Sequence, residues 1–350
     1  MFFKKKASFL GLDIGSSSIK LVELKLNKKN YELINFGSVP IPSETIVDGA
    51  ILASSTVVDG ISNLISSLKI KTKDVVTSVS GHSVIVKKIV LPTTTSQELA
   101  NSIQWEAEQY IPFDISDVYI DFQILGPSKE DPDLMDVMLV AAKIELVNDY
   151  VAAIKDAGLN PVIVDVDCFA IQNAFEYNYG ILPDEIVALV NIGANVMNIN
   201  ILRDGISSFT RDIAIGGKQI TEELQKQLNI DFETAEAAKV GMSVEGIQKE
   251  EVGEVVKNAV VSISTEIQRS LDFFSASAGH QEITKVYLFG GCVKVHEIVL
   301  SLEEKLNIPV EIVNSFNRIE VNPKNFDPQY LAENSAIAGV SVGLALRVGD

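Results

Sequence analysis

Residues 9–24 read Phe-Leu-Gly-Leu-Asp-Ile-Gly-Ser-Ser-Ser-Ile-Lys-Leu-Val-Glu-Leu, and this stretch decides the fold. An apolar run that carries Asp13 is broken by Gly15 and three serines, and a second apolar run follows. The pattern predicts a buried strand, a tight turn and a returning strand. Gly15 lets a ligand approach the backbone, the serines offer donors to a phosphate, and Asp13 is placed to hold a hydrated Mg²⁺. Alone, the stretch fits an ordinary serine-rich hairpin equally well.

A second copy of this pattern begins near the middle of the chain. Residues 186–192 form an apolar run, Gly193 starts a turn, and residues 197–202 form a returning run. Aligned on the turn glycines, Asp13 of the first copy falls on Asn191 of the second. A repeat that divides the chain into halves is a stronger signal than either copy, and two facing hairpins can grip a phosphate chain. A repeated hairpin that serves only for packing remains the alternative.

The composition excludes several classes of protein. The chain has 350 residues, of which 47% are hydrophobic and 22% charged, so it is globular and long enough for two domains. Its formal net charge of −18 argues against nucleic acid as a partner. Two distant cysteines, Cys168 and Cys292, favour a reducing compartment and give no disulfide framework or zinc site. No stretch approaches the ~20 apolar residues that cross a bilayer, so we expect a cytoplasmic protein without direct membrane insertion.

Residues 75–164 read as an insert with the order β-β-α-β-β-α-β. Within it, residues 96–110 predict a helix that begins with a capping box formed by Thr95 and Glu98. An apolar group lies at the end of this helix and just beyond it: Trp105, Tyr110, Ile111 and Phe113. Each of them singly is best explained as part of the insert's core, and together they are candidates for the wall of a peptide groove.

The second half holds two further glycine signals and a helix of small residues. An apolar strand at residues 286–289 runs directly into Gly290 and Gly291, and another turn is marked by Gly216 and Gly217. Residues 334–346 predict one helix whose small side chains allow very close packing against a neighbour.

These features, in this order along nearly the whole chain, resemble the actin, heat-shock chaperone and sugar kinase ATPase superfamily. The resemblance implies an actin-like (ribonuclease H-like) α/β fold with two duplicated lobes and an inserted subdomain like that of FtsA. It divides the chain into four parts: a first lobe of residues 1–74, 165–185 and 332–350; an insert of residues 75–164; a second lobe of residues 186–215 and 283–331; and its subdomain of residues 216–282.

Three stretches resemble the PilM family of type IV pilus assembly proteins more narrowly: residues 10–24, 104–113 and 210–217. This resemblance implies binding of ATP or ADP with Mg²⁺. It also implies capture of the N-terminal cytoplasmic peptide of the membrane protein PilN, in a groove between the first lobe and the insert. Through PilN the chain would join the PilN/PilO membrane complex, and contacts with other pilus motor components stay open. We therefore expect a cytoplasmic protein held peripherally at the inner membrane by a partner.

The resemblance also assigns residues to the nucleotide site. The first phosphate loop comprises Asp13, Gly15, Ser16, Ser17, Ser18 and Lys20, with Asp13 on the metal side, and the second comprises Asn191, Gly193, Ala194 and Asn195. The adenine and ribose are framed by Gly216, Gly217, Glu222 and Lys239, and the adenosine loop comprises Gly290, Gly291 and Cys292.

Two departures from the superfamily pattern bear on hydrolysis. Asn191 stands where many members have Asp, and the candidate catalytic base is Asp167, where many have Glu. Loss of one carboxylate and shortening of another weaken activation of water more than they weaken binding. We therefore expect ATP binding with slow hydrolysis at most.

Two other functions fit the same fold. An FtsA-like, filament-forming cell-division protein ends in a basic amphipathic membrane helix, and residues 346–350 show no such tail. A small-molecule kinase needs an Asp on a loop over its substrate, and we find no such constellation. Both remain alternatives to a nucleotide-regulated scaffold.

Overall fold

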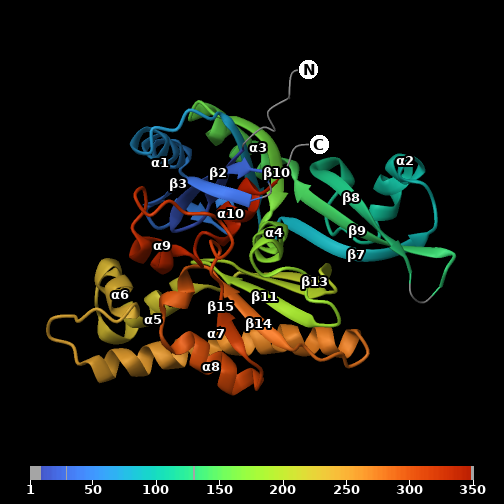
Figure 1. The fold of residues 1–350 in the computed structure, drawn as a ribbon. Helices are drawn as coiled ribbons and strands as arrows, with labels where there is room; N and C mark the ends of the chain where they lie inside the picture. The colour runs from blue at the N-terminus through green and yellow to red at the C-terminus, as the bar shows by residue number, and fades with distance from the viewer. Residues whose placement is uncertain (1–8, 29, 129–130, 348–350) are drawn as a thin grey trace.

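A computed structural model describes residues 9–28, 30–128 and 131–347, so the last three residues of the 346–350 stretch lie outside it. Within these residues two five-stranded sheets form two lobes, and a three-stranded sheet projects to one side (Figure 1). The described helices include none that is long and apolar enough to cross a membrane.

The first lobe is built on the sheet β10-β6-β1-β2-β3. Its strands are β1 (Leu10–Ile14), β2 (Ser18–Asn27), β3 (Asn30–Pro40), β6 (Asp74–Val79) and β10 (Asn160–Val166). β1 and β2 pair antiparallel, which confirms the predicted hairpin, and β1 pairs parallel with β6 on its other side. A two-stranded ribbon, β4 (Ile46–Val47) and β5 (Ala50–Ile51), precedes α1 (Ser54–Ser67), which packs with α3 (Ile144–Asp156).

The second lobe repeats this arrangement with the sheet β13-β12-β11-β14-β15. Its strands are β11 (Ile186–Ile192), β12 (Met197–Arg203), β13 (Ile206–Ile213), β14 (Lys285–Phe289) and β15 (Val310–Ile312). β11 pairs antiparallel with β12 and parallel with β14, as β1 does with β2 and β6, so the predicted second hairpin and the duplication are both present.

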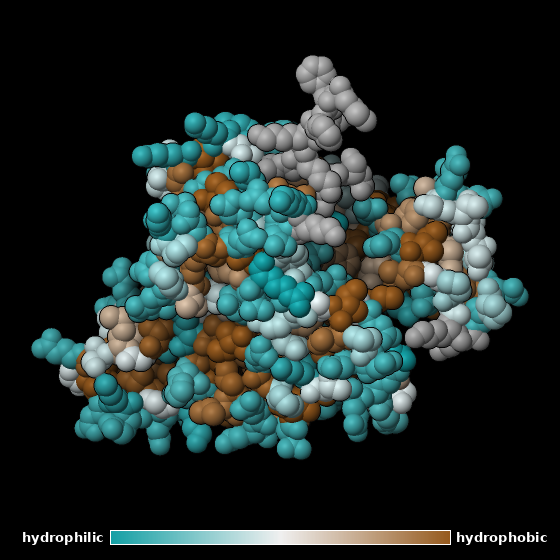
Figure 2. Space-filling model, in the orientation of Figure 1, coloured by the Kyte–Doolittle hydropathy of each residue, from teal (hydrophilic) through white to brown (hydrophobic). Residues whose placement is uncertain are grey.

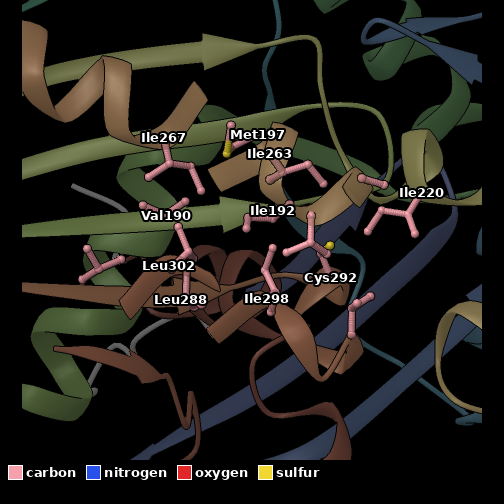
Figure 3. Packing of buried hydrophobic residues seen from close by; sticks show 14 of the residues in the cluster. Val190, Ile192, Met197, Ile220, Ile263, Ile267, Leu288, Cys292, Ile298 and Leu302 are labelled. Carbon is pink, nitrogen blue, oxygen red and sulfur yellow. The ribbon is translucent and has the colours of Figure 1, made fainter. Parts of the chain in front are cut away.

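Four helices accompany the second sheet: α5 (Gly217–Leu228), α6 (Phe232–Lys239), α7 (Lys249–Ser277) and α8 (Glu297–Leu306). Figure 3 shows the core between them and the sheet, where Val190 and Ile192 of β11 pack with Ile263 of α7 and Leu302 of α8. A short 3₁₀ helix, η2 (Gly291–Lys294), connects β14 to α8 and directs Cys292 into this core.

The three-stranded sheet is shorter in sequence than the predicted insert. It contains β7 (Val84–Pro92), β8 (Val118–Pro127) and β9 (Leu134–Lys143), with α2 (Ser96–Ala107) and the short η1 (Ile115–Asp117). The capping box of Thr95 and Glu98 is present. α3 and most of β6 and β10 fall in the predicted 75–164 range, yet they belong to the first lobe. β6 pairs parallel with β1 on one side and with β10 on the other, and α3 packs in the same core.

Two helices lie between the lobes and fix their approach. α4 (Asp167–Tyr179) contacts α10 (Gly339–Ala345), and glycines make the contact close. A Cβ added to Gly343 of α10 would lie 1.7 Å from the carbonyl oxygen of Ala170 on α4. α10 approaches β1 equally closely, since a Cβ added to Gly11 would lie 1.9 Å from the carbonyl oxygen of Ser341. The close packing predicted for residues 334–346 is therefore present. The single helix predicted there is wrong: α9 (Pro328–Asn334) ends first, and in the turn before α10 the Ala336 carbonyl accepts from Gly290 N at 3.0 Å.

Candidate functional site

A cavity of about 440 Å³ lies where the turns of the two hairpins meet. It brings together sixteen of the residues predicted for the site, from both halves of the chain: Asp13, Gly15, Ser16, Ser17, Ser18, Lys20, Asp167, Asn191, Gly193, Ala194, Asn195, Gly217, Lys239, Gly290, Gly291 and Cys292. Two predicted residues do not line it, Gly216 and Glu222. Gly216 instead allows α5 to begin against the second turn, because a Cβ there would lie 2.4 Å from the Ala194 oxygen. Glu222 lies one turn into α5, 3.7 Å from Lys218 Nζ.

The first turn places a buried ion pair on the cavity wall. Asp13 and Lys20 face each other across β1 and β2, and Lys20 Nζ lies 3.2 Å from Asp13 Oδ2 with both side chains 11% exposed. Gly15 N donates to the Ser18 carbonyl at 3.2 Å, which closes the turn. The Lys20 cation and the turn hydroxyls thus meet at one end of the cavity as a donor set that suits a phosphate, with the Asp13 carboxylate beside them.

Asp167 lies at the start of α4 and accepts a hydrogen bond from Ser78 Oγ at 2.6 Å. Burial, and then the charge of Asp13, raise the pKa of this carboxyl to about 6, against the lowering effect of hydrogen bonds from Ser78 and Ser80. A carboxylate with a pKa near neutrality is suited to accept a proton at physiological pH.

The second turn presents amides where the first presents charges. Asn191 Nδ2 donates to Asn198 Oδ1 at 2.9 Å, and Asn195 Nδ2 reaches into the first lobe to the Ile46 carbonyl at 3.2 Å. The described residues contain no group of three or more His, Cys, Asp or Glu side chains placed to hold a metal. A divalent ion beside Asp13 therefore needs most of its ligands from water or from a bound molecule.

The adenosine-loop prediction falls on a backbone that only glycine tolerates easily. Gly290 has a φ of 90°, and a Cβ there would lie 2.4 Å from the Ile192 oxygen and 2.7 Å from Asn191 Oδ1. Burial raises the pKa of the Cys292 thiol to about 12, so this cysteine packs and does not react.

The cavity is also lined by residues that the sequence did not single out for the site, among them the charged and aromatic side chains of Glu44, Lys218, Phe232 and Glu236. Glu236 and Lys239 form an ion pair one helical turn apart on α6, and Lys239 Nζ also donates to Thr221 Oγ1 at 2.9 Å. Their i, i+3 spacing was a usable signal. Lys218 of the second lobe forms an ion pair with Glu44 of the first. No local sequence pattern predicts a contact between residues so far apart in the chain.

The four residues predicted to bind a partner peptide differ in how far their side chains are exposed. Ile111 belongs to the core of the insert, which leaves it inaccessible to a peptide. Tyr110 and Phe113 are partly buried, with Lys87 Nζ 5.2 Å from the first ring and Lys143 Nζ 4.7 Å from the second. Trp105 is 73% exposed on α2.

Residues 11–349 match the family model of the type IV pilus assembly protein PilM. The chain belongs to the PilM family. A solved structure of a PilM–PilN type IV pilus biogenesis complex contains a chain with 31% identity, a TM-score of 0.87 and 98% coverage of both chains. The family assignment therefore agrees with the resemblance found in the sequence.

More distant structures share the fold. The ethanolamine utilization protein EutJ from Carboxydothermus hydrogenoformans matches with a TM-score of 0.57 and 14% identity, covering 97% of this chain and 89% of that chain. MreB5 of Spiroplasma citri bound to AMPPNP matches with a TM-score of 0.51 and 14% identity, covering 96% and 94%. Together with the PilM match, these likenesses establish an actin-like fold for the chain.

Proposed function

We propose that this PilM-family chain binds ATP between its lobes and acts as a nucleotide-regulated scaffold in type IV pilus assembly. The observation that carries the proposal is the meeting of two glycine-turn hairpins, one from each half, at a single cavity with Lys20 and Asp13 at its edge. The solved MreB5 structure of the same fold contains an ATP analogue, which supports a nucleotide as the occupant.

The donor set fits ATP accompanied by Mg²⁺. Turn hydroxyls and Lys20 suit the phosphates, while Asp13 supplies one carboxylate to a metal whose other ligands are waters and phosphate oxygens. Mg²⁺ would supply charge neutralisation of the phosphates. Asp167, near the same wall, is the candidate to accept a proton from an attacking water.

We expect ATP binding without rapid turnover, because the second hairpin offers the Asn191 amide in place of a carboxylate. A fluorescent ATP analogue measures binding by titration, and phosphate release measures turnover. Lys20→Ala should weaken binding at least 10-fold through loss of a charge-assisted contact. Lys25→Ala, an exposed position on the same strand, is the matched control and should bind as the wild type does. Turnover on the order of 10 s⁻¹, typical of metabolic enzymes, would contradict the proposal.

We further propose that the partner is the N-terminal cytoplasmic peptide of PilN, received beside the insert. A relative with 31% identity over 98% of its chain was solved as a PilM–PilN complex, which supports this partner. Figure 2 displays hydrophobic side chains over the insert's sheet, and Val90 and Tyr119 of this sheet are exposed. Binding to a membrane-anchored PilN would hold the chain at the inner membrane.

Trp105 and Phe113 are the candidates to test for peptide contact. Trp105→Ala and Phe113→Ala should each weaken binding of a labelled PilN peptide about 5- to 30-fold in an anisotropy titration, as loss of an aromatic anchor does. Phe273→Ala, which removes a 61% exposed aromatic side chain from α7, is the control and should leave the affinity unchanged. An unaltered affinity in both insert variants would remove these residues from the groove.

A further inference from the structure

A chain of hydrogen bonds links the base of the insert to the second phosphate loop through Asp212. Gly81 N, in the loop before β7, donates to Asp212 Oδ2 at 2.7 Å. Asn198 Nδ2 donates to Asp212 Oδ1 at 2.8 Å, and Asn191 Nδ2 donates to Asn198 Oδ1 at 2.9 Å. Four polar groups from both lobes thus form one continuous path that ends on the cavity wall.

The carboxylate sets the direction of every bond in this path. Burial raises the pKa of Asp212, and the hydrogen bonds from Asn198 and Gly81 act against this by favouring the carboxylate. As a carboxylate Asp212 only accepts, so Asn198, 1% exposed, must turn its NH₂ group toward it and its oxygen toward Asn191. Asn191 must then spend its own NH₂ group on Asn198. Its oxygen is left beside Gly290, where an added Cβ would lie 2.7 Å away. The orientation of the Asn191 amide is therefore set by Asp212, which is two hydrogen bonds away along the path.

We propose that Asp212 is a positioning residue of the nucleotide site, which fixes Asn191 with its amide oxygen toward the cavity. The proposal rests on the proposed binding of ATP. Phosphate oxygens are acceptors and offer nothing to an amide oxygen, whereas waters around Mg²⁺ are donors. Asn191 held in this orientation suits the hydrated metal of MgATP and not the phosphates themselves.

Strand β13, which carries Asp212, contacts the insert at a second point. Thr210 lies two residues before Asp212 on β13, and its Oγ1 donates to the Val86 carbonyl of β7 at 2.8 Å. A displacement of β7 therefore reaches Asp212 through both Gly81 and Thr210. A peptide bound to the insert could therefore affect the position of Asn191 through these hydrogen bonds, without rearranging the hydrophobic core of either lobe.

Two variants test the direction of the path. In Asp212→Asn the new amide accepts from Gly81 and donates to Asn198, so Asn198 and Asn191 can both reverse while every bond is kept. Asn191 then turns its NH₂ group to the cavity. In the double variant Asn198→Asp/Asp212→Asn (the swap) the two residues are exchanged. The aspartate at position 198 only accepts, from the new amide at 212 and from Asn191, so Asn191 returns to its original orientation.

The first measurement needs no nucleotide. Side-chain NMR of the full chain follows hydrogen exchange of the Asn191 amide, identified by its absence in Asn191→Asp. We expect exchange to quicken at least 10-fold in Asp212→Asn and to return to the wild-type rate in the swap. Unchanged exchange in Asp212→Asn, or failure of the swap to restore it, overturns the proposal. If Asp212→Asn does not fold, Asn198→Ala removes the middle link and must quicken exchange likewise.

The second measurement is the affinity for ATP with Mg²⁺ and in its absence. We expect Asp212→Asn to weaken MgATP binding about 5- to 10-fold, with metal-free ATP little affected, and the swap to restore it. Removal of a negative charge alone would strengthen binding of an anion, so the sign separates the two explanations. Ser207→Ala, which removes a buried hydroxyl that donates to Asn200 on the same two strands, should leave MgATP affinity unchanged. A wild type that binds no ATP refutes the proposed function, and the exchange measurement then decides the role of Asp212 alone.

Discussion

Gly343→Ala should be the most damaging single-methyl substitution in the contact between α10 and α4, the two helices that lie between the lobes. The added Cβ would lie 1.7 Å from the carbonyl oxygen of Ala170 and 2.5 Å from its carbon, and both belong to the backbone of α4. No side-chain rotation relieves such an overlap, so α10 must move away from α4. We expect the free energy of unfolding to fall by about 3 kcal/mol or more, measured by urea denaturation of the chain without nucleotide.

Gly253→Ala provides the matched control for this prediction. Gly253 also lies inside a helix, α7, but an added Cβ there would meet nothing within 4 Å. Alanine should stabilise this helix by about 0.5–1 kcal/mol, because glycine loses more backbone entropy on folding. Equal effects of the two substitutions would mean that α10 and α4 are not in close contact.

Short-range signals in the sequence predict the parts of this fold that matter most for the site. Gly15 and Gly193 each interrupt an apolar run, and the structure places a turn at both. The insert was bounded less well, because β6 reads as an apolar strand whichever sheet it joins. Its partners β1 and β10 are distant in sequence, and hydrophobic periodicity carries no information about pairing.

The same distinction explains which site residues were found. Asp13 and Lys20 lie in one hairpin, so their meeting follows from a local register. Glu44 meets Lys218 only because the two lobes close on each other, and Glu44 itself has a left-handed φ of 66° that no motif announces. The proposed role of Asp212 could not be predicted from the sequence either, because it depends on a hydrogen bond from Gly81, a residue distant in sequence.

Asp167→Asn is expected to stabilise the protein while it removes residual hydrolysis. The pKa of Asp167 is raised from 3.8 to about 6 in the folded protein, first by burial and then by the charge of Asp13. Between these two values the folded state binds more protons than the unfolded state, so stability falls as the pH rises through this window. The penalty is absent below about pH 4 and complete above about pH 6.

Asparagine carries no charge and can still accept the hydrogen bond of Ser78 at Oδ1. Asp167→Asn should therefore raise the free energy of unfolding at pH 8 by about 1–3 kcal/mol, and change it little at pH 3.5. Urea denaturation at the two pH values measures this difference. Asp59→Asn, at an exposed position on α1, is the control and should alter stability little at either pH.

Phosphate release separates a catalytic Asp167 from one that is merely buried. Any slow release by the wild type should rise through about pH 6 as Asp167 loses its proton, and Asp167→Asn should lack both the rise and the activity while it retains ATP. If Asp167→Asn is stabilised at pH 8 but releases phosphate as fast as the wild type, Asp167 has a raised pKa but is not the catalytic base. Loss of release without stabilisation would instead mean that its carboxylate is solvated in the folded chain.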